Sequence, residues 1–257
     1  MSSNDSIKKT LIVAFSLCIV CSVIVSTAAV VLKPAQEANQ ALDRKRNILA
    51  AAGMLDPDRS VEEQLAQMTT RVVDLRTGRY TDEVDPARYN ERKAAKDAAL
   101  SDALSSEEDI AKIFRREHYA VVYLSENDQG TVEKIILPIR GYGLWGTLFG
   151  YIALEGDAST VAGIGFYEHK ETPGLGGEVD NPRWKASWTG KQVYDDGEME
   201  LEVIKGTVDP SAPDAEYKVD GLAGATLTTR GVSNLVAFWL GESGFEPFLN
   251  NLKSGEA

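Results

Sequence analysis

The stretch Asp220-Gly221-Leu222-Ala223-Gly224-Ala225-Thr226 places one hydroxyl group at the end of a loop of small residues, directly before an amphipathic segment. Apolar residues from Leu227 to Leu240 keep a roughly helical spacing, and glycine follows at Gly241. The pattern predicts that Thr226 lies near the N-terminus of a helix. Free N–H groups and the helix dipole favour an anion such as phosphate there, and the glycines leave room for a large ligand beside the backbone.

A glycine-containing turn with a threonine N-cap explains the same residues without a ligand. Two further segments bear on the choice. The segment Glu171-Thr172-Pro173-Gly174-Leu175-Gly176-Gly177 follows an apolar run, 161–167, and its Gly and Pro content indicates a shaped surface loop. The segment Gly141-Tyr142-Gly143-Leu144-Trp145-Gly146 presents aromatic and aliphatic side chains on a glycine frame, which suits a flat ring. Each segment alone is also explained by a turn with core anchors.

Taken together, the three segments resemble the FMN-binding domain shared by the C subunit of the Na+-translocating NADH:quinone reductase and the G subunit of the Rnf electron-transport complex. The resemblance runs from the opening segment, 4–10, to Phe238-Trp239-Leu240-Gly241. The length and the N-terminus are more similar to the quinone reductase protein. In this family a threonine of the last segment carries FMN through a phosphoester bond to its hydroxyl. The resemblance implies that Thr226 is this covalent acceptor.

The other residues of a flavin site follow from the same resemblance. Residues expected to line the ring or the phosphate of FMN are Thr172, Leu175, Gly176, Leu144 and Trp145. Lys205 either approaches the flavin phosphate or ring as a cation or is simply exposed. Trp184 either packs in the core with Trp188 or shields the flavin.

Three positions bear on attachment of the flavin. The family usually has Ser or Thr three residues before the acceptor, whereas this chain has Ala223. The loss of this hydroxyl puts the efficiency of attachment in doubt, but not its chemistry. Thr228 and Thr229 are alternative hydroxyls, which helical position is expected to turn away from the flavin.

The N-terminal segment predicts a membrane anchor. Leu11 to Leu32 is a run of 22 residues without a charge, enough at about 1.5 Å per residue to cross a hydrocarbon layer of roughly 30 Å. A cleaved signal peptide is the competing interpretation, since Ser26-Thr27-Ala28 could form a cleavage site. The run is longer than the roughly 7–15 apolar residues of a signal peptide, which favours a retained helix.

Charge limits the partners of the domain but does not orient it. The chain has 27 Lys and Arg against 39 Asp and Glu, a net charge of −12, which disfavours nucleic acid and anionic lipid surfaces as partners. Basic residues flank both ends of the apolar run, so the positive-inside rule leaves its direction open. The resemblance implies a single-pass protein of the bacterial inner membrane, with its soluble domain in the periplasm.

Cysteine, histidine and nucleophile patterns exclude several kinds of site. Both cysteines, Cys18 and Cys21, lie in the apolar run, so the rest of the chain cannot form disulfides or cysteine-ligated metal centres. The two histidines, His118 and His169, form no metal-ligand cluster. The sequence also lacks a G-x-G-x-x-G fingerprint between a strand and a helix, and we expect no catalytic residue and no metal. The chain is expected to relay electrons and not to oxidise a substrate by itself.

The spacing of apolar residues predicts an α+β fold. Helix is expected over Ala35–Ala52 and across much of Arg88–Arg116, which is rich in Ala, Glu, Lys and Asp. Strands are expected at 72–75, 119–124, 132–139, 148–154, 161–167 and 201–204. We expect a cytoplasmic N-terminus at 1–10, a transmembrane helix at 11–32, a helical supporting region at 33–118 and an FMN-binding α+β region at 119–257.

The resemblance also implies partners. The expected complex oxidises NADH, reduces ubiquinone and exports Na+, and it contains further A, B, D, E and F subunits. Electrons would arrive from an iron–sulfur centre in the D and E subunits and leave toward a flavin on the B subunit. A separate flavin transferase using FAD and Mg2+ would attach the FMN. Two alternatives are an Rnf-type G subunit, with ferredoxin and NAD as end partners, and a membrane-anchored module without redox activity.

Overall fold

The computed structural model describes residues 6–257. The first residues of the quoted opening segment, Asn4 and Asp5, and the other positions of 1–5 lie outside the described residues. The chain forms two compact units that divide between Asp43 and Arg44. Helix α1 (Ile7–Ala51) contributes to both units.

The first unit contains the apolar part of α1. Among the described residues, α1 is the one helix long and apolar enough to cross a membrane, and its most apolar window has a mean hydropathy of 2.6. Its large apolar side chains, such as Leu11 and Phe15, are exposed, which suits a lipid environment. The expected span 11–32 and the expected helix Ala35–Ala52 form one helix, because Pro34 lies inside α1 without ending it.

The second unit is built on a six-stranded antiparallel sheet with the strand order β2-β1-β5-β6-β7-β8. Its strands are β1 (Thr69–Asp74), β2 (Arg79–Tyr80), β5 (Tyr119–Glu126), β6 (Val132–Tyr142), β7 (Thr147–Glu155) and β8 (Val161–Glu168). Five of the six expected strands therefore lie in this sheet, and the sixth is the short β11 (Glu202–Val203). Strand β1 pairs along its length with β5, so the expected regions 33–118 and 119–257 share one sheet.

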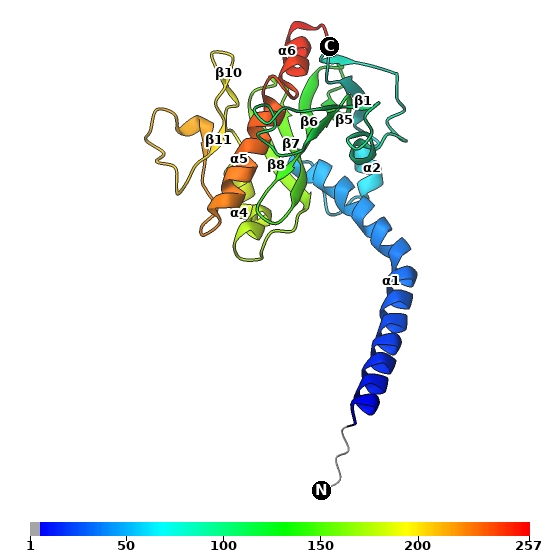
Figure 1. Cartoon of the computed structure of the whole chain (residues 1–257). Helices are drawn as coiled ribbons and strands as arrows, with labels where there is room; N and C mark the ends of the chain where they lie inside the picture. The colour runs from blue at the N-terminus through cyan, green and yellow to red at the C-terminus, as the bar shows by residue number, and fades with distance from the viewer. Residues whose placement is uncertain (1–5) are drawn as a thin grey trace. The chain divides into compact units, whose positions relative to one another are not determined.

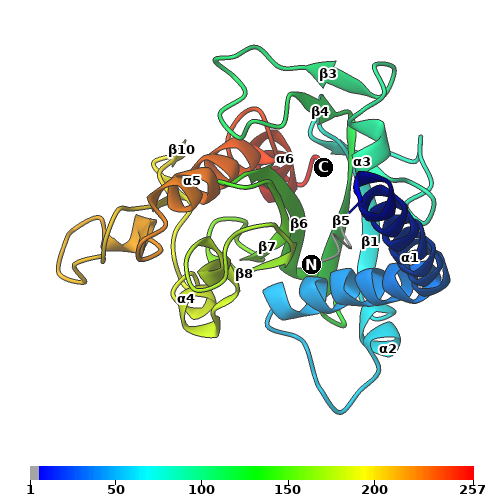
Figure 2. The same ribbon diagram turned by 60° about the horizontal axis from the view of Figure 1, so that its bottom comes forward.

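Helices cover both faces of the sheet. On one face, α5 (Thr226–Leu240) packs on β6, and α4 (Pro182–Ala186) packs on β8 (Figures 1 and 2). This face holds the main core, in which Leu235 and Trp239 of α5 are fully buried. On the opposite face, the last turns of α1 lie so close to β8 that a Cβ added to Gly163 would be 2.6 Å from the carbonyl oxygen of Ala51.

The remaining elements are short. They are α2 (Val61–Leu65), α3 (Glu91–Ala94), β3 (Ser101–Ala103), β4 (Arg115–Glu117), η1 (Gly176–Asp180), β9 (Tyr194–Asp195), β10 (Glu198–Met199), η2 (Ala215–Tyr217), β12 (Lys218–Val219) and α6 (Glu246–Ser254). The small sheets are β3 with β4, β9 with β10, and β11 with β12.

The expectation of helix over much of Arg88–Arg116 is wrong. The segment contains one turn of helix, α3, followed by β3, irregular backbone and the start of β4. Side chains within the segment bond to nearby backbone N–H groups: Asn90 caps α3, and Asp97 and Asp109 accept bonds from the turns that follow them. Short Asn and Asp side chains compete with helical hydrogen bonding in this way, so a composition rich in helix formers does not decide the structure here.

Candidate functional site

Thr226 is the first residue of α5, as expected, and it is exposed. The loop before it turns at Gly224, where φ is +72°, a conformation that favours glycine. The amide of Thr229 donates to the carbonyl of Ala225 at 2.9 Å and starts the helical ladder. Within residues 6–257, no side chain caps this end of α5. The first N–H groups of the helix and the Thr226 hydroxyl therefore face a site suited to an anion.

The neighbouring threonines have structural hydrogen bonds. Thr228 is buried, and its hydroxyl donates to Oε2 of Glu171 at 2.5 Å. Thr229 is also buried, and its hydroxyl accepts a bond from the amide of Leu222 at 3.0 Å. Of the three threonines at the start of α5, Thr226 is the one whose hydroxyl is open to modification.

Glu171 joins the three segments that the sequence singles out. Its side chain is buried, with only 5% of the residue surface exposed. Oε1 accepts bonds from the amides of Leu144 and Trp145, both at 3.0 Å, while Oε2 accepts the bond from Thr228. One carboxylate thus fixes the turn between β6 and β7, the loop after β8 and the start of α5. The sequence pattern does not predict this role for Glu171, because its partners are 26, 27 and 57 residues away.

Glycines allow these segments to approach one another. A Cβ added to Gly143 would lie 2.6 Å from Oε1 of Glu171, and one added to Gly176 would lie 2.5 Å from Oγ1 of Thr228. Side chains cannot occupy such positions without displacing the carboxylate or the helix. The glycine content of the two loops therefore serves the assembly of the site.

Apolar side chains surround the start of α5 and remain exposed. Trp145 and Leu144 project from the turn that Glu171 holds, and 62% of the Trp145 surface is exposed. Leu175 lies near the loop before Thr226, since a Cβ added to Gly224 would be 3.1 Å from its Cδ2. Leu227 is exposed beside Thr226. An apolar surface next to an anion site fits a ligand with a flat ring and a phosphate.

The other predicted contacts are more varied. Thr172 is exposed, and its carbonyl accepts bonds from the amides of Leu175 and Gly177 at 3.1 and 2.9 Å, which closes the loop. Gly176 is buried under this loop. Lys205 is exposed, and within the described chain its side chain has no hydrogen bond or ion pair. Its segment does reach the site, because the amide of Gly221 donates to the carbonyl of Gly206 at 2.8 Å.

Trp184 lies in the core, in agreement with the packing interpretation of the sequence. Its ring contacts Trp188 edge to face, with 5.5 Å between the centroids. Its indole N–H donates to the carbonyl of Asp220 at 2.8 Å. Trp184 therefore anchors the start of the loop that leads to Thr226.

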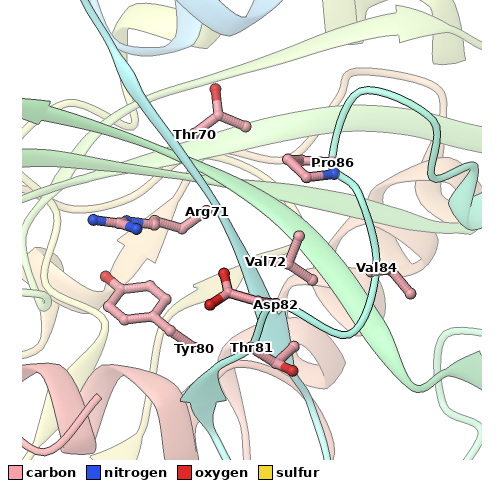
Figure 3. Close-up of a pocket in the computed structure, with 8 residues that line it drawn as sticks. All are labelled: Thr70, Arg71, Val72, Tyr80, Thr81, Asp82, Val84 and Pro86. Carbon is pink, nitrogen blue, oxygen red and sulfur yellow. The ribbon is translucent and has the colours of Figure 1, made fainter.

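A cavity of about 390 Å³ lies elsewhere, between β1 and the segment after β2 (Figure 3). Arg71 and Tyr80 line it, with the guanidinium carbon 5.9 Å from the ring centroid. None of the predicted site residues borders this cavity. It is separate from the candidate site at Thr226.

Comparison with known proteins places this geometry in a family. Residues 143–241 match the model of the FMN-binding domain family. This range contains Leu144, Trp145, the loop 171–177 and Thr226. The match ends at Gly241, directly after α5.

Relatives of the whole chain carry one name. The C subunit of the Na(+)-translocating NADH-quinone reductase of Pseudomonas aeruginosa is 56% identical over 262 residues, covering 100% of both chains. The corresponding protein of Vibrio vulnificus is 48% identical and covers 99% of both chains. Among solved structures, NqrC of Shewanella oneidensis has a TM-score of 0.77 at 34% identity, covering 84% of this chain and 99% of that one. The C-subunit structure from Parabacteroides distasonis has a TM-score of 0.65 at 28% identity, covering 85% of this chain and 96% of that one.

Proposed function

Because the chain belongs to the C-subunit family of the Na+-translocating NADH-quinone reductase, we propose that it carries FMN on Thr226 through a phosphoester bond and relays electrons within that complex. Members of this family are subunits of a membrane-bound oxidoreductase that translocates sodium, and the FMN-binding domain makes the chain a flavoprotein. The observation that carries the proposal is the exposure of Thr226 beside the buried Thr228 and Thr229.

The residues at the site fit FMN. The Thr226 hydroxyl would bear the phosphate, and the first N–H groups of α5 would stabilise its negative charge. The residues proposed to hold the ring or phosphate are Thr172, Leu175, Gly176, Leu144, Trp145 and Lys205. FMN supplies the electron-transfer chemistry when it is bound. A covalent bond would retain it at the exposed surface around Thr226.

Attachment is proposed to need a separate enzyme. A flavin transferase that uses FAD and Mg2+ would form the bond from the Thr226 oxygen to the phosphorus of FMN and break the pyrophosphate bond of FAD, with AMP as the leaving group. The small side chains of Ala223, Gly224 and Ala225 leave the acceptor accessible to such an enzyme. This accessibility supports a reaction in trans.

The proposal also covers the partner subunits of the chain and its location in the membrane. We infer that the chain receives electrons from an iron–sulfur centre held by the D and E subunits and passes them toward the flavin of the B subunit, with A and F completing the complex and ubiquinone as the final acceptor. Helix α1 supports a single-pass anchor in the inner membrane. The proposed topology has a cytoplasmic segment at 1–10, a span at 11–32, a supporting region at 33–118 and an FMN-binding region at 119–257, the last two in the periplasm.

The comparisons favour the quinone reductase over the Rnf alternative. Identity to the C-subunit relatives extends over the whole chain, including the N-terminal anchor and residues before the FMN-binding domain. The alternative of a module without redox activity leads to a different experimental result, because its purified form would hold no flavin.

The test uses the full chain, expressed with and without a flavin transferase and separated on a denaturing gel. We expect ultraviolet fluorescence of the band with the transferase only, and none from Thr226→Ala. Thr229→Ala serves as the matched control, and the band from its soluble protein should still fluoresce. A dark band from the unaltered chain, or a fluorescent Thr226→Ala band, would refute covalent attachment at Thr226.

A further inference from the structure

A basic cavity of about 560 Å³ is lined in part by Arg140 and Tyr142 at the end of β6 and by Thr147 and Phe149 at the start of β7. Five cationic side chains border it: Arg92, Lys96, Lys112, Arg115 and Arg140. Among the described residues that line this cavity, none is acidic. Two of these cations are paired with carboxylates outside the lining, Arg92 with Glu168 and Arg140 with Glu117. Lys96, Lys112 and Arg115 supply the remaining positive charge, on a chain whose net charge is −12. A cavity of this character attracts an anionic group.

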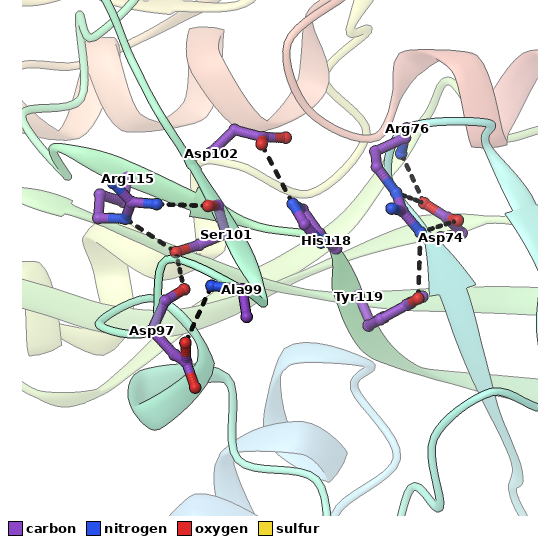
Figure 4. A network of polar contacts seen from close by, with 9 residues as sticks. All are labelled: Asp74, Arg76, Asp97, Ala99, Ser101, Asp102, Arg115, His118 and Tyr119. Carbon is purple, nitrogen blue, oxygen red and sulfur yellow. Dashed lines mark hydrogen bonds and ion pairs between the residues drawn. The ribbon is translucent and has the colours of Figure 1, made fainter.

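The three arginines are held in place by the protein. The guanidinium carbon of Arg92 lies 3.6 Å from the ring centroid of Phe149, and the guanidinium forms an ion pair with Glu168 at 2.8 Å. Arg115 donates to the hydroxyl of Ser101 at 2.9 Å and to its carbonyl, and the Ser101 hydroxyl donates to the carbonyl of Asp97 at 2.6 Å (Figure 4). Arg140 forms an ion pair with the buried Glu117. These arginines therefore form fixed walls.

The two lysines differ from the arginines. Lys96 and Lys112 are exposed at the rim, and within residues 6–257 neither has an ion pair or a side-chain hydrogen bond. Their charges are free to pair with an incoming acidic group. The lining between them includes Ile113, Phe114 and Phe149. The cavity thus combines free cations with apolar surface.

Phe114 is presented by a strained turn. Lys112 and Phe114 have φ angles of 54° and 64°, in the left-handed region that non-glycine residues rarely adopt. The carboxylate of Asp109 holds the turn by accepting bonds from the amides of Ile113 and Phe114 at 2.7 and 2.8 Å. As a result 74% of the Phe114 surface is exposed. Strain that displays an apolar side chain to solvent is a feature of binding surfaces.

We propose that this cavity docks an acidic segment of another polypeptide of the complex, with an apolar side chain of that segment against Phe114. The charge and the apolar lining are complementary to such a segment. Aromatic residues and arginine are also enriched in protein–protein interfaces, compared with the rest of the protein surface. The family to which the chain belongs consists of subunits of a larger assembly, so partner polypeptides are present. The proposal rests on this membership and on the cavity, and it does not depend on attachment of FMN to Thr226.

The cavity shares the β6–β7 hairpin with the candidate site. Tyr142 and Thr147 border it and pair with each other at the end of β6 and β7. The turn between them carries Leu144 and Trp145 of the candidate site. A segment docked in the cavity would therefore contact the hairpin whose turn belongs to the candidate site, and would bring a neighbouring polypeptide near that site.

The test places the photoreactive residue p-benzoylphenylalanine at Phe114 in the full chain, within the assembled complex purified in detergent. After irradiation, crosslinked peptides are identified by mass spectrometry. We expect a crosslink to another polypeptide of the complex, in a segment with more acidic than basic residues. The crosslink yield should fall about tenfold with K96E/K112E, as expected for the loss of two rim charge pairs. R88E/K93E, which changes the net charge equally at exposed residues outside the cavity lining, should leave the yield unchanged.

Salt provides the same test without a substitution. Raising the ionic strength from about 0.1 M to 1 M screens exposed charges, so the yield from the unaltered lysines should fall. Crosslinks only to lipid, to this chain or to nothing would overturn the proposal. So would equal yields from K96E/K112E and R88E/K93E, or a yield that does not respond to salt.

Discussion

Two irregular segments of the domain are each held by one carboxylate, but over different distances in the chain. Glu171 accepts bonds from the amides of Leu144 and Trp145 and from the Thr228 hydroxyl, all at least 26 residues away. Asp109 accepts bonds from the amides of Ile113 and Phe114, four and five residues on. The first carboxylate assembles a site from distant segments, while the second shapes a single turn.

This difference separates global from local effects of substitution. Loss of Glu171 should disturb three segments together, and with them the candidate flavin site. Loss of Asp109 should relax one turn and leave that site intact. Substitutions at Glu171, Gly176 and Asp109 test this contrast directly, and substitutions at Asp74 and Ala223 extend it to a third carboxylate and to the loop before Thr226.

The largest effect is expected from Glu171→Ala. Two amides and a buried hydroxyl would lose their acceptor, which should lower the free energy of unfolding by about 3–5 kcal/mol. Attachment of FMN to Thr226 should fall with it, because the surrounding loops lose their positions. Thermal melts followed by tryptophan fluorescence and gel fluorescence measure the two effects. The exposed Glu202 provides a control, and Glu202→Ala should change neither quantity.

A smaller but related effect is expected from Gly176→Ala. The new Cβ would lie 2.5 Å from Oγ1 of Thr228 and 2.6 Å from Oε2 of Glu171. Overpacking at this point should lower the free energy of unfolding by about 1–3 kcal/mol, measured by the same melts. Gly146→Ala is the matched control, because its Cβ would meet only the flexible side chain of Lys170 at 3.2 Å. Equal melting temperatures for the two variants would argue against close packing of Gly176 on Glu171 and Thr228.

The effect of Asp109→Ala should be local. The turn loses two hydrogen bonds near the surface, and we expect a loss of about 1 kcal/mol of unfolding free energy. The yield of FMN attachment should match that of the unaltered chain. If the yield falls as far as it does with Glu171→Ala, the contrast between the two carboxylates does not hold.

A third carboxylate, Asp74, should make the stability of the domain depend on pH. Burial opposes its ionisation, but the hydrogen bonds from Arg76 outweigh burial and lower the pKa of Asp74 (Figure 4). A lowered folded-state pKa contributes stability above the unfolded pKa of about 3.9, and that contribution is lost as pH falls through the folded-state pKa. Arg76 is partly exposed, so solvent should keep the effect modest.

The measurement compares melting temperatures of the unaltered chain and Asp74→Asn from about pH 6 to pH 2. The unaltered chain should be more stable near neutral pH, and the gap should narrow on acidification. A gap that is constant over this range would contradict a role for the ionised Asp74.

The smallest effect is expected from Ala223→Ser, which adds a hydroxyl three residues before Thr226. Ala223 is exposed in the loop before Thr226. One added hydrogen bond in this loop should raise the initial rate of FMN attachment by about threefold. Timed gel fluorescence with limiting transferase measures this rate. A slower reaction than that of the unaltered chain would show that the serine hydroxyl hinders attachment.

The sequence is informative where apolar periodicity and tertiary burial agree. Runs rich in β-branched and aromatic residues between turn residues place the long strands β5 to β8, and the apolar spacing after Thr226 gives α5, which has Gly241 as its C-cap. The segment 88–116 departs from its predicted helix because Asp97 and Asp109 bind nearby amides and replace helical bonds.

Within the candidate site, residues of one contiguous segment could be predicted, whereas contacts between distant segments could not. The resemblance indicates Thr226 and its neighbours from contiguous segments, and the burial of Thr228 and Thr229 agrees with their expected orientation. The role of Glu171 could not be inferred, because a carboxylate at the start of a loop gives no local sign of which distant amides it will bind. The same holds for Trp184, whose bond to the Asp220 carbonyl spans 36 residues.

The most direct measurement of the central claim is peptide mass mapping of the full chain after expression with its flavin transferase. The peptide that contains Thr226, Thr228 and Thr229 should gain the mass of FMN less one water, and fragmentation should place the gain on Thr226. A gain on Thr228 or Thr229, or an unmodified peptide from a fluorescent protein, would contradict the assignment.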